Sequence, residues 1–347
     1  MASNSTTSSG SLVKSGLSNK SLKVMSGSSH VGTGGLSGES LNIFNTLSAE
    51  DQASLTNVGQ SAYVEAAKVG GGSYIQAVSS SRAVGVVIPS KTGAIDDHFH
   101  NGNFDLNVHL PSGTGLKLEG PELLLTATET KNYFGNLINE LIPGQSSYKD
   151  AFNAAVTKAA NHSGDGSAVH LLSPDDQFAG SGYLGLSGTP DIKETVVINM
   201  YGVKSSHAVQ ISDFDSSVIA GSGSVNIAGS IGAFVVGDAA DQKITGGSGN
   251  DTLFGGGGND ILTGGSGADI FGIGFTGNTM ITDFNSAAGD KLSFDSSMTL
   301  QSLLRAEVSI VHVGAFAITD IALDGHNIYL VGVDPSQLTL NMIQFSS

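Results

Sequence analysis

Residues 246–272 read GGSGNDTLF, GGGGNDILT and GGSGADIFG, three consecutive copies of the nine-residue pattern G-G-x-G-x-D-x-U-x, in which U is a large apolar residue. The glycines allow the backbone to take positive φ in a tight turn that exposes its carbonyl groups. The aspartate at the sixth place supplies a hard oxygen ligand of the kind that calcium prefers. The apolar residue at the eighth place is expected to lie on a short strand and to point inward. The stretch therefore predicts a stack of strands and glycine turns that binds calcium.

The apolar place of the pattern continues beyond the three complete copies. It is occupied at six positions, each one repeat length after the last: Val235, Ile244, Leu253, Leu262, Phe271 and Met280. Two nonapeptides are expected to make one turn of a parallel β-roll, in which each turn buries its apolar residue only against its neighbours. The sequence therefore predicts a roll that is longer than its perfect repeats.

This spacing assigns candidate calcium ligands to two sides of the roll. Asp251 and Asp269 are two repeats apart and are expected to face one row of ions. Asp260 lies on the other side, where Asn278, a weaker oxygen donor, stands two repeats later and Gln242 stands two repeats earlier. We therefore expect one well-formed site between the turns of Asp251 and Asp269, and one or two poorer sites around Asp260.

The repeat resembles that of the RTX (repeats-in-toxin) proteins, which type I secretion exports. In that family the backbone carbonyls of the glycine turns complete the coordination of calcium. The resemblance implies further ligands, which are Gly246, Ser248, Gly264 and Gly267 in the first site and Gly255 and Gly257 in the second. It also implies a protein that is secreted, and either extracellular or associated with the cell surface.

Two later segments resemble parts of the serralysin-type C-terminal domain. Residues 281–294, ITDFNSAAGDKLSF, resemble the element that follows the β-roll. This implies that Asp283 and Asp290 are extra calcium ligands, and a solvated loop is the alternative. Residues 326–345, HNIYLVGVDPSQLTLNMIQF, resemble the terminal strands and the uncleaved type I secretion signal, although the acidic residue typical of that signal is missing. The resemblance covers about residues 235–347 and does not extend to residues 1–210.

The charge of the chain favours a cation as its partner. The formal net charge is −16, and residues 213–295 contain ten aspartates, no glutamate and two lysines, which gives −8 for that segment alone. Clustered carboxylates repel one another without a cation, so metal binding and folding are expected to be coupled. Nothing in this segment neutralises phosphates, which argues against a nucleic-acid partner. The chain has no cysteine, and it has no run of apolar residues long enough to span a membrane.

The expected organisation has four parts. Residues 1–38 form a flexible Ser/Gly-rich tail or an arm, residues 39–210 a mixed α/β domain of unknown type, residues 211–295 the β-roll with its nonapeptide repeats, and residues 296–347 the C-terminal strands with the secretion signal. The fold class is thus an α+β N-terminal domain followed by a C-terminal parallel β-roll, which is all-β and binds calcium. The pattern predicts a helix over 48–68, strands over 83–88, 104–110, 122–128, 195–201 and 208–211, and helices over 130–142 and 147–160.

Signatures of catalysis are absent from the sequence, with one segment left open. None of the nine histidines is followed by glutamate, which excludes the H-E-x-x-H zinc helix, and no G-x-S-x-G string occurs. His98 and His100 would share a face if they lay on a strand, a geometry used for zinc or iron together with a carboxylate. The alternative is a polar surface loop, because Asn101-Gly102-Asn103 signals a turn.

These observations favour a non-enzymatic function. The interpretation is a secreted calcium-binding structural or surface protein, such as a matrix, filament, adhesin or surface-layer component, that folds and self-assembles with calcium. Its expected partners are further copies of itself or an anionic component of the cell surface, besides the type I secretion machinery. The alternatives are an RTX-tailed secreted hydrolase or lyase with an unrecognised N-terminal catalytic domain, and an effector that acts on a host by binding.

Overall fold

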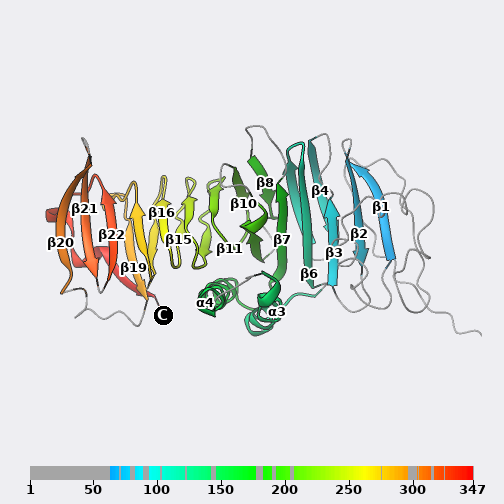
Figure 1. Cartoon of the computed structure of the whole chain (residues 1–347), viewed down its shortest axis with the longest axis horizontal. Coiled ribbons are helices and arrows are strands. Elements are labelled where there is room, and N and C mark those ends of the chain that lie inside the picture. The colour runs from blue at the N-terminus through cyan, green and yellow to red at the C-terminus, as the bar shows by residue number, and fades with distance from the viewer. Residues whose placement is uncertain are drawn as a thin grey trace, which may run out of the picture.

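Two long β-sheets run the length of an elongated molecule, with their strands stacked along its long axis (Figure 1). The computed structural model describes residues 63–69, 72–78, 83–88, 94–101, 104–121, 123–141, 146–176, 183–189, 193–203, 207–274, 276–295, 303, 305–313, 316–323 and 325–346. The first sheet has the order β1 (Tyr63–Val69), β2 (Gly72–Val78), β3 (Ala83–Ile88), β6 (Thr114–Pro121), β7 (Ala168–Asp176), β9 (Glu194–Asn199), β11 (Ser216–Ala220), β13 (Phe234–Gly237), β15 (Thr252–Phe254), β17 (Ile270–Ile273), β19 (Lys291–Asp295) and β23 (Ile343–Ser346).

The second sheet faces the first. Its order is β20 (Glu307–Val313), β21 (Phe316–Leu323), β22 (His326–Val331), β18 (Asn278–Ile281), β16 (Asn259–Thr263), β14 (Gln242–Thr245), β12 (Gly223–Ile227), β10 (Ala208–Ser212), β8 (Tyr183–Ser187), β5 (Phe104–Leu110) and β4 (Ile95–Asn101). The chain alternates between the two sheets from β7 to β19, so each pair of strands forms one turn of a roll.

Strand direction divides each sheet into a parallel middle and antiparallel ends. The strands from β7 to β23 in the first sheet, and from β8 to β22 in the second, pair in parallel. Antiparallel strands adjoin them, before β7 and β8 and after β22. The C-terminal parallel β-roll is thus confirmed in its coarse form. Parallel pairing already begins before residue 211, and the four-part division of the chain stays a prediction.

Five of the six positions of the expected apolar ladder form the buried centre of the roll. Their side chains are fully buried: Val235, Ile244, Leu253, Leu262 and Phe271. The sixth position is wrong, because Leu262 pairs with Ile281 rather than with Met280. Gly274 stacks on Gly256, two repeats earlier, since a Cβ on it would collide with the carbonyl oxygen of Gly256. Gly277 stacks in the same way on Gly258, although the residue two repeats earlier is Asn259. One residue is therefore inserted between Gly274 and Gly277, and it shifts the register of β18 on β16 by one.

Two helices cover the outer face of the first sheet. α3 (Ala127–Leu141) and α4 (Ser146–Ser163) confirm the helices expected over 130–142 and 147–160. Figure 1 shows both of them along one side of the stacked strands. Their buried residues form a second core with the outer face of the sheet: Phe134, Phe152, Ala155, Val156 and Ala159 pack with Val169, Val197, Val218, Val236 and Phe254. The part of the chain before the repeats is thereby attached to the roll.

Three expected elements of the N-terminal part differ in the structure. Residues 63–68 lie in β1, so the helix over 48–68 is wrong at its end, and the rest of that range lies outside the described residues. The strand over 122–128 is wrong because α3 begins there: Thr126 and Glu129 cap each other's backbone N–H at 3.2 and 2.9 Å. β9 ends at Asn199, whose side chain accepts the N–H of Tyr201 at 3.1 Å and starts a short 3-10 helix, η2 (Met200–Gly202). The strands over 83–88, 104–110 and 208–211 are confirmed.

The end of the chain returns to the roll. Two short 3-10 helices, η3 (Pro335–Gln337) and η4 (Leu340–Met342), lead from β22 to β23. Within the described residues, no helix is both long and apolar enough to span a bilayer.

Candidate calcium-binding turns

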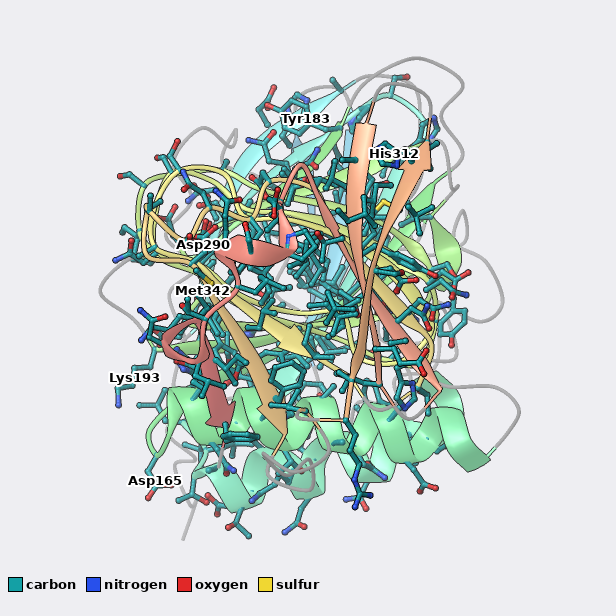
Figure 2. All side chains as sticks on the ribbon, turned by 90° about the vertical axis from the view of Figure 1, so that its left-hand side faces the viewer. Asp165, Tyr183, Lys193, Asp290, His312 and Met342 are labelled. Carbon is teal, nitrogen blue, oxygen red and sulfur yellow. The ribbon has the colours of Figure 1, made fainter. Side chains whose placement is uncertain are left out.

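The turns of the roll form two rows, one along each long edge. The first row leads from the second sheet back to the first and contains residues 228–233, 246–251, 264–269 and 282–290. The second row leads in the other direction and contains residues 238–241, 255–258 and 274–277. Asp251, Asp269, Asp283 and Asp290 all lie in the first row, whereas Asp260 follows a turn of the second row. Figure 2 looks along the roll and labels Asp290 beside the stacked turns.

Three buried carboxylates connect consecutive turns of the first row. Oδ1 of Asp251 accepts the N–H of Ala233 at 2.8 Å, Oδ1 of Asp269 accepts that of Asp251 at 2.8 Å, and Oδ1 of Asp290 accepts that of Asp269 at 2.9 Å. The three aspartates are 1%, 1% and 5% exposed. Each carboxylate thus uses one oxygen to hold the turn before it, which places the negative charges in a column.

The second oxygens of this column have different partners. Oδ2 of Asp251 accepts the N–H of Gly247 at 2.9 Å, and Oδ2 of Asp290 accepts that of Asn285 at 2.8 Å. Oδ2 of Asp269 lies against Gly264 and accepts no hydrogen bond from any described residue. The turn of Asp269 therefore offers a carboxylate oxygen to a ligand.

Asp283 adds a fourth carboxylate to the first row. It accepts the N–H groups of Gly264 and Gly265 at 2.9 and 2.8 Å. The predicted extra ligand thus holds the turn before it with both of its oxygens.

Glycines enclose these carboxylates so closely that a Cβ would fill the space. A Cβ on Gly246 would lie 2.5 Å from Oδ2 of Asp251 and would collide with the carbonyl oxygen of Gly264. Gly267, with φ +143°, takes a conformation that other residues rarely adopt. The exposed Ser248 donates its N–H and its hydroxyl to the carbonyl of Gly229, both at 3.1 Å. These turns leave carbonyl oxygens and carboxylates around a space that only glycine keeps open.

The second row repeats this geometry with an amide in place of one carboxylate. Oδ1 of Asp260 accepts the N–H of Gln242 at 2.9 Å, and Oδ2 of Asp260 lies against Gly255. A Cβ on Gly237 would lie 2.6 Å from Oε1 of Gln242, much as one on Gly246 would meet Asp251. Nε2 of Gln242 donates to the buried Asp238 at 2.7 Å, and Oε1 is buried without a hydrogen-bond partner. Gln242 therefore occupies the place of the repeat aspartate and presents an unsatisfied oxygen.

Asn278 does not continue this row. Thr279 pairs with Asp260, and Asn278 instead pairs with Asn259. The amide of Asn278 donates to Asn259 at 2.8 Å and accepts the N–H of Asn327 at 3.0 Å. The expectation that Asn278 stacks on Asp260 is wrong, because the residue inserted after Gly274 shifts the register by one.

Asp238 belongs to a copy of the repeat that departs from the nine-residue pattern. Residues 237–245 read GDAADQKIT, a degenerate copy that keeps the first glycine and the apolar Ile244 but loses the sixth-place aspartate. Asp238 stands at the second place of this copy, where the pattern has glycine. Gly237 and Ile244, which keep the first and eighth places of the pattern, are the sequence signal that marks residues 237–245 as a copy of the repeat.

Burial makes these carboxylates costly to ionise. Burial raises the pKa of Asp260 to about 7, with Asp241 and Asp238 adding to the effect and the N–H of Gln242 opposing it. Burial likewise raises the pKa values of Asp238, Asp269 and Asp290, and neighbouring carboxylates add to the rise for the last two. A cation beside these groups would relieve both the desolvation and the repulsion.

Side chains alone do not complete a metal site. Among the described residues, no three His, Asp or Glu side chains converge on one point. A calcium ion between two turns would therefore take a carboxylate from each turn and complete its six to eight oxygens from backbone carbonyls and water. The open oxygen of Asp269 and the orphaned Oε1 of Gln242 fit that requirement.

His98 and His100 lie on β4, which forms a hairpin with β5. Alternate residues of a strand share a face, so these positions meet the backbone condition for a metal site, while their side chains lie outside the described residues. The expected surface loop is wrong, because the strand continues to Asn101. The metal site itself stays a prediction.

The stacked glycine turns, with one buried aspartate or its substitute in each repeat, define a calcium-binding parallel β-roll. Residues 236–271 match the family model of the RTX calcium-binding nonapeptide repeat in four copies, a range that takes in the degenerate copy. The chain therefore carries RTX repeats, which are calcium-binding, while its N-terminal half remains unassigned to any family. No curated protein matches the chain.

The raised pKa values predict how the metal-free protein responds to pH. A carboxyl whose folded pKa exceeds its unfolded value stabilises the fold at low pH, and this stability is lost as the pH rises through the folded pKa. For Asp260 this stability is lost between about pH 4 and about pH 7, and the loss in the free energy of unfolding is at most about 4 kcal/mol. The metal-free chain is therefore expected to keep more of the roll's circular dichroism at about pH 5 than at about pH 8, where calcium is required for folding.

Calcium should reverse this pH trend, because it binds deprotonated carboxylates. The same pair of dichroism measurements in saturating calcium serves as the control. A metal-free protein that grows more stable from about pH 5 to about pH 8 would contradict the assignment of costly buried charges.

Proposed function

We propose that the chain is a secreted calcium-binding structural or surface protein, which is exported by type I secretion, folds in external calcium and assembles with further copies of itself. The column formed by Asp251, Asp269 and Asp290 carries this proposal. A chain with so many buried, mutually repelling carboxylates needs a cation to reach a stable fold. Calcium at extracellular concentration supplies it, and a calcium-poor cytosol does not.

The proposed ligands follow the two rows. In the first row Asp251 and Asp269 hold one calcium ion with backbone carbonyls from the turns of Gly246, Ser248, Gly264 and Gly267, and Asp283 and Asp290 extend the row. In the second row Asp260 holds a weaker site with carbonyls from Gly255 and Gly257. Gln242, rather than Asn278, supplies the second side-chain oxygen of this site. The carboxylates of the first row make it the tighter of the two.

The remaining parts of the chain keep their proposed roles. The expected tail or arm of residues 1–38 lies outside the described residues, and we propose that its lysines contact a neighbouring copy or an anionic component of the cell surface. Residues 39–210 form an α+β domain, which is supported by the packing of α3 and α4 on the first sheet. Residues 211–295 carry the repeats of the β-roll, whose parallel strands begin earlier, at β7 and β8, and residues 296–347 carry the secretion signal. A matrix, filament, adhesin or surface-layer role fits this arrangement.

Calcium removal tests the proposal directly. With calcium, the backbone amides of the roll should resist hydrogen exchange and circular dichroism should report its strands; a calcium chelator should abolish both signals. The half-point is expected at roughly 10⁻⁴–10⁻³ M calcium. Magnesium at the same concentration is the control, since it demands a tighter octahedral geometry and should not restore the fold.

Two outcomes would contradict the proposal. A dichroism spectrum that the chelator leaves unchanged would separate folding from calcium. Electron microscopy should show ordered assemblies that vanish in chelator, and a monomer under both conditions would refute the structural role.

A second candidate, a secreted enzyme, rests on one groove of the second sheet. The groove encloses about 480 Å³ and is lined in part by Asp96, His109 and Tyr183. Nδ1 of His109 lies 2.5 Å from Oδ1 of Asp96, and its ring lies 4.9 Å from that of Tyr183. Metal analysis of the calcium-free chain tests this candidate. Bound zinc or iron in the wild type that is lost in a His98→Gln, His100→Gln double variant would support it. A chain free of both metals would exclude the metal-dependent form of it.

A further inference from the structure

The last strand of the second sheet, β20, lies exposed at one end of the molecule. It pairs with β21 on one edge, and within the described part of the chain no strand pairs with its other edge. Figure 1 shows it at the far left, and Figure 2 looks onto this end, with His312 labelled. All seven of its residues are exposed, and four of them are large and apolar: Val308 at 48%, Ile310 at 50%, Val311 at 42% and Val313 at 58%.

An edge of this kind is unusual for a soluble surface. A free strand edge presents unpaired N–H and C=O groups to any other strand, and proteins normally block it with charges, proline or a covering segment. The neighbouring β21 behaves as expected for an inner strand, since Ile318, Ile321 and Leu323 are all buried. β20 instead carries apolar residues on both of its faces, with only Glu307 and His312 as ionisable groups.

The residue order of β20 fits a second copy of itself. In an antiparallel pair centred on Ile310, Glu307 stands opposite Val313, Val308 opposite His312 and Ser309 opposite Val311. No acid faces an acid, and Ile310 meets Ile310 at the axis, an apolar cross-strand pair of the kind that stabilises a sheet. Glu307 faces Val313 only at the two ends of the pair. The strand at the other end of this sheet, β4, contains Asp96 and Asp97 and would add two carboxylates near Glu307.

We propose that β20 pairs in antiparallel fashion with β20 of a second copy, about a two-fold axis at Ile310, so that the second sheets of two molecules become continuous. The contact is isologous, because the same strand serves both partners. The inference rests on the self-assembly in the proposed function and names the surface through which it occurs. Two short strands bury little area, so the association is concentration-dependent rather than permanent.

Sedimentation velocity of the full chain in saturating calcium tests the contact. The wild type should shift from monomer to dimer with rising concentration, and Ile310→Lys should raise the dissociation constant at least about tenfold, because a charge then faces its own copy across the axis. Ile261→Lys is the matched control: this isoleucine is 38% exposed in the same sheet, but β16 has both edges paired. Calcium-induced circular dichroism confirms that each variant folds.

The absence of cysteine from the chain allows a second, independent test. Ile310→Cys faces itself across the axis at a distance that a disulfide can bridge, so mild oxidation should give a covalent dimer. Ile261→Cys should stay monomeric. A covalent dimer formed equally well by Glu307→Cys would overturn the register, since that residue faces Val313.

The outcomes separate this contact from self-assembly in general. If the wild type and Ile310→Lys associate equally, the β20 contact is wrong and assembly occurs through another surface. A wild type that remains monomeric at every concentration in calcium overturns the contact together with the self-assembly of the proposed function, while calcium-dependent folding stands.

Discussion

Replacement of Asp269 by asparagine is expected to raise the calcium concentration at half-folding of the roll by about ten- to a hundredfold. Asp269 lies in the middle of the carboxylate column, where it accepts the N–H of Asp251 while its own N–H donates to Asp290. Asparagine has nearly the same shape and can keep the first hydrogen bond through its oxygen. Its NH₂ group then replaces the open Oδ2 beside Gly264, and it repels a cation where the carboxylate would bind one.

The size of this effect follows from the loss of one charged ligand. Hydrogen bonds to charged groups contribute about 1.5–3 kcal/mol, and each 1.4 kcal/mol corresponds to about a factor of ten in an equilibrium constant. The measurement is a calcium titration followed by circular dichroism, with the wild type and the variant at equal protein concentration.

Asp241→Asn provides the matched control. Asp241 also accepts a backbone N–H from a residue two repeats along the chain, that of Asn259 at 2.8 Å, but it is exposed on the other row. This variant should shift the calcium half-point by less than about threefold, since an exposed charge is screened by solvent. An Asp269→Asn half-point equal to that of the wild type would remove Asp269 from the site.

The repeat predicted the middle of the fold because local pattern and long-range packing agree there. From Val235 to Phe271 each ninth residue is buried, and each glycine turn has the length that brings the next strand into register. The pattern predicted the wrong residue, Met280, at the sixth position, because the glycine-rich turn before it contains one additional residue. The sequence alone does not show this insertion; the stacking of Gly274 and Gly277 on earlier turns does.

The start of the roll could not be found from the nonapeptide. Strands β9 to β12 pair in parallel and bury Ile198, Ile219 and Val225 completely between the two sheets, although no glycine-aspartate turn connects them. Parallel pairing requires inward-pointing apolar residues, and it accepts several turn sequences. The same freedom concealed Asp238, because its contact with the amide that replaces the repeat aspartate belongs to this copy alone.

Phe271→Ala is expected to destabilise the calcium-loaded protein by about 3–5 kcal/mol. Phe271 is fully buried, its backbone pairs with Leu253 and Leu292 on the two sides, and its ring lies 6.1 Å from that of Phe284. The turns on either side are rigid glycine structures held by carboxylates, so they cannot collapse into the cavity that alanine would leave.

Urea unfolding in saturating calcium measures this loss, and Phe345→Ala is its control. Phe345 is a phenylalanine of the same sheet, but it is 44% exposed on the last strand, so its removal should cost less than about 1.5 kcal/mol. Equal losses for the two variants would contradict the buried ladder as the core of the roll.

Phe271→Ala is also expected to weaken calcium binding, because the ring of Phe271 lies against Gly264: a Cβ on Gly264 would lie 2.8 Å from Cζ of Phe271. Its loss should therefore loosen the turn of Asp269 and raise the calcium half-point, although Phe271 offers no ligand atom.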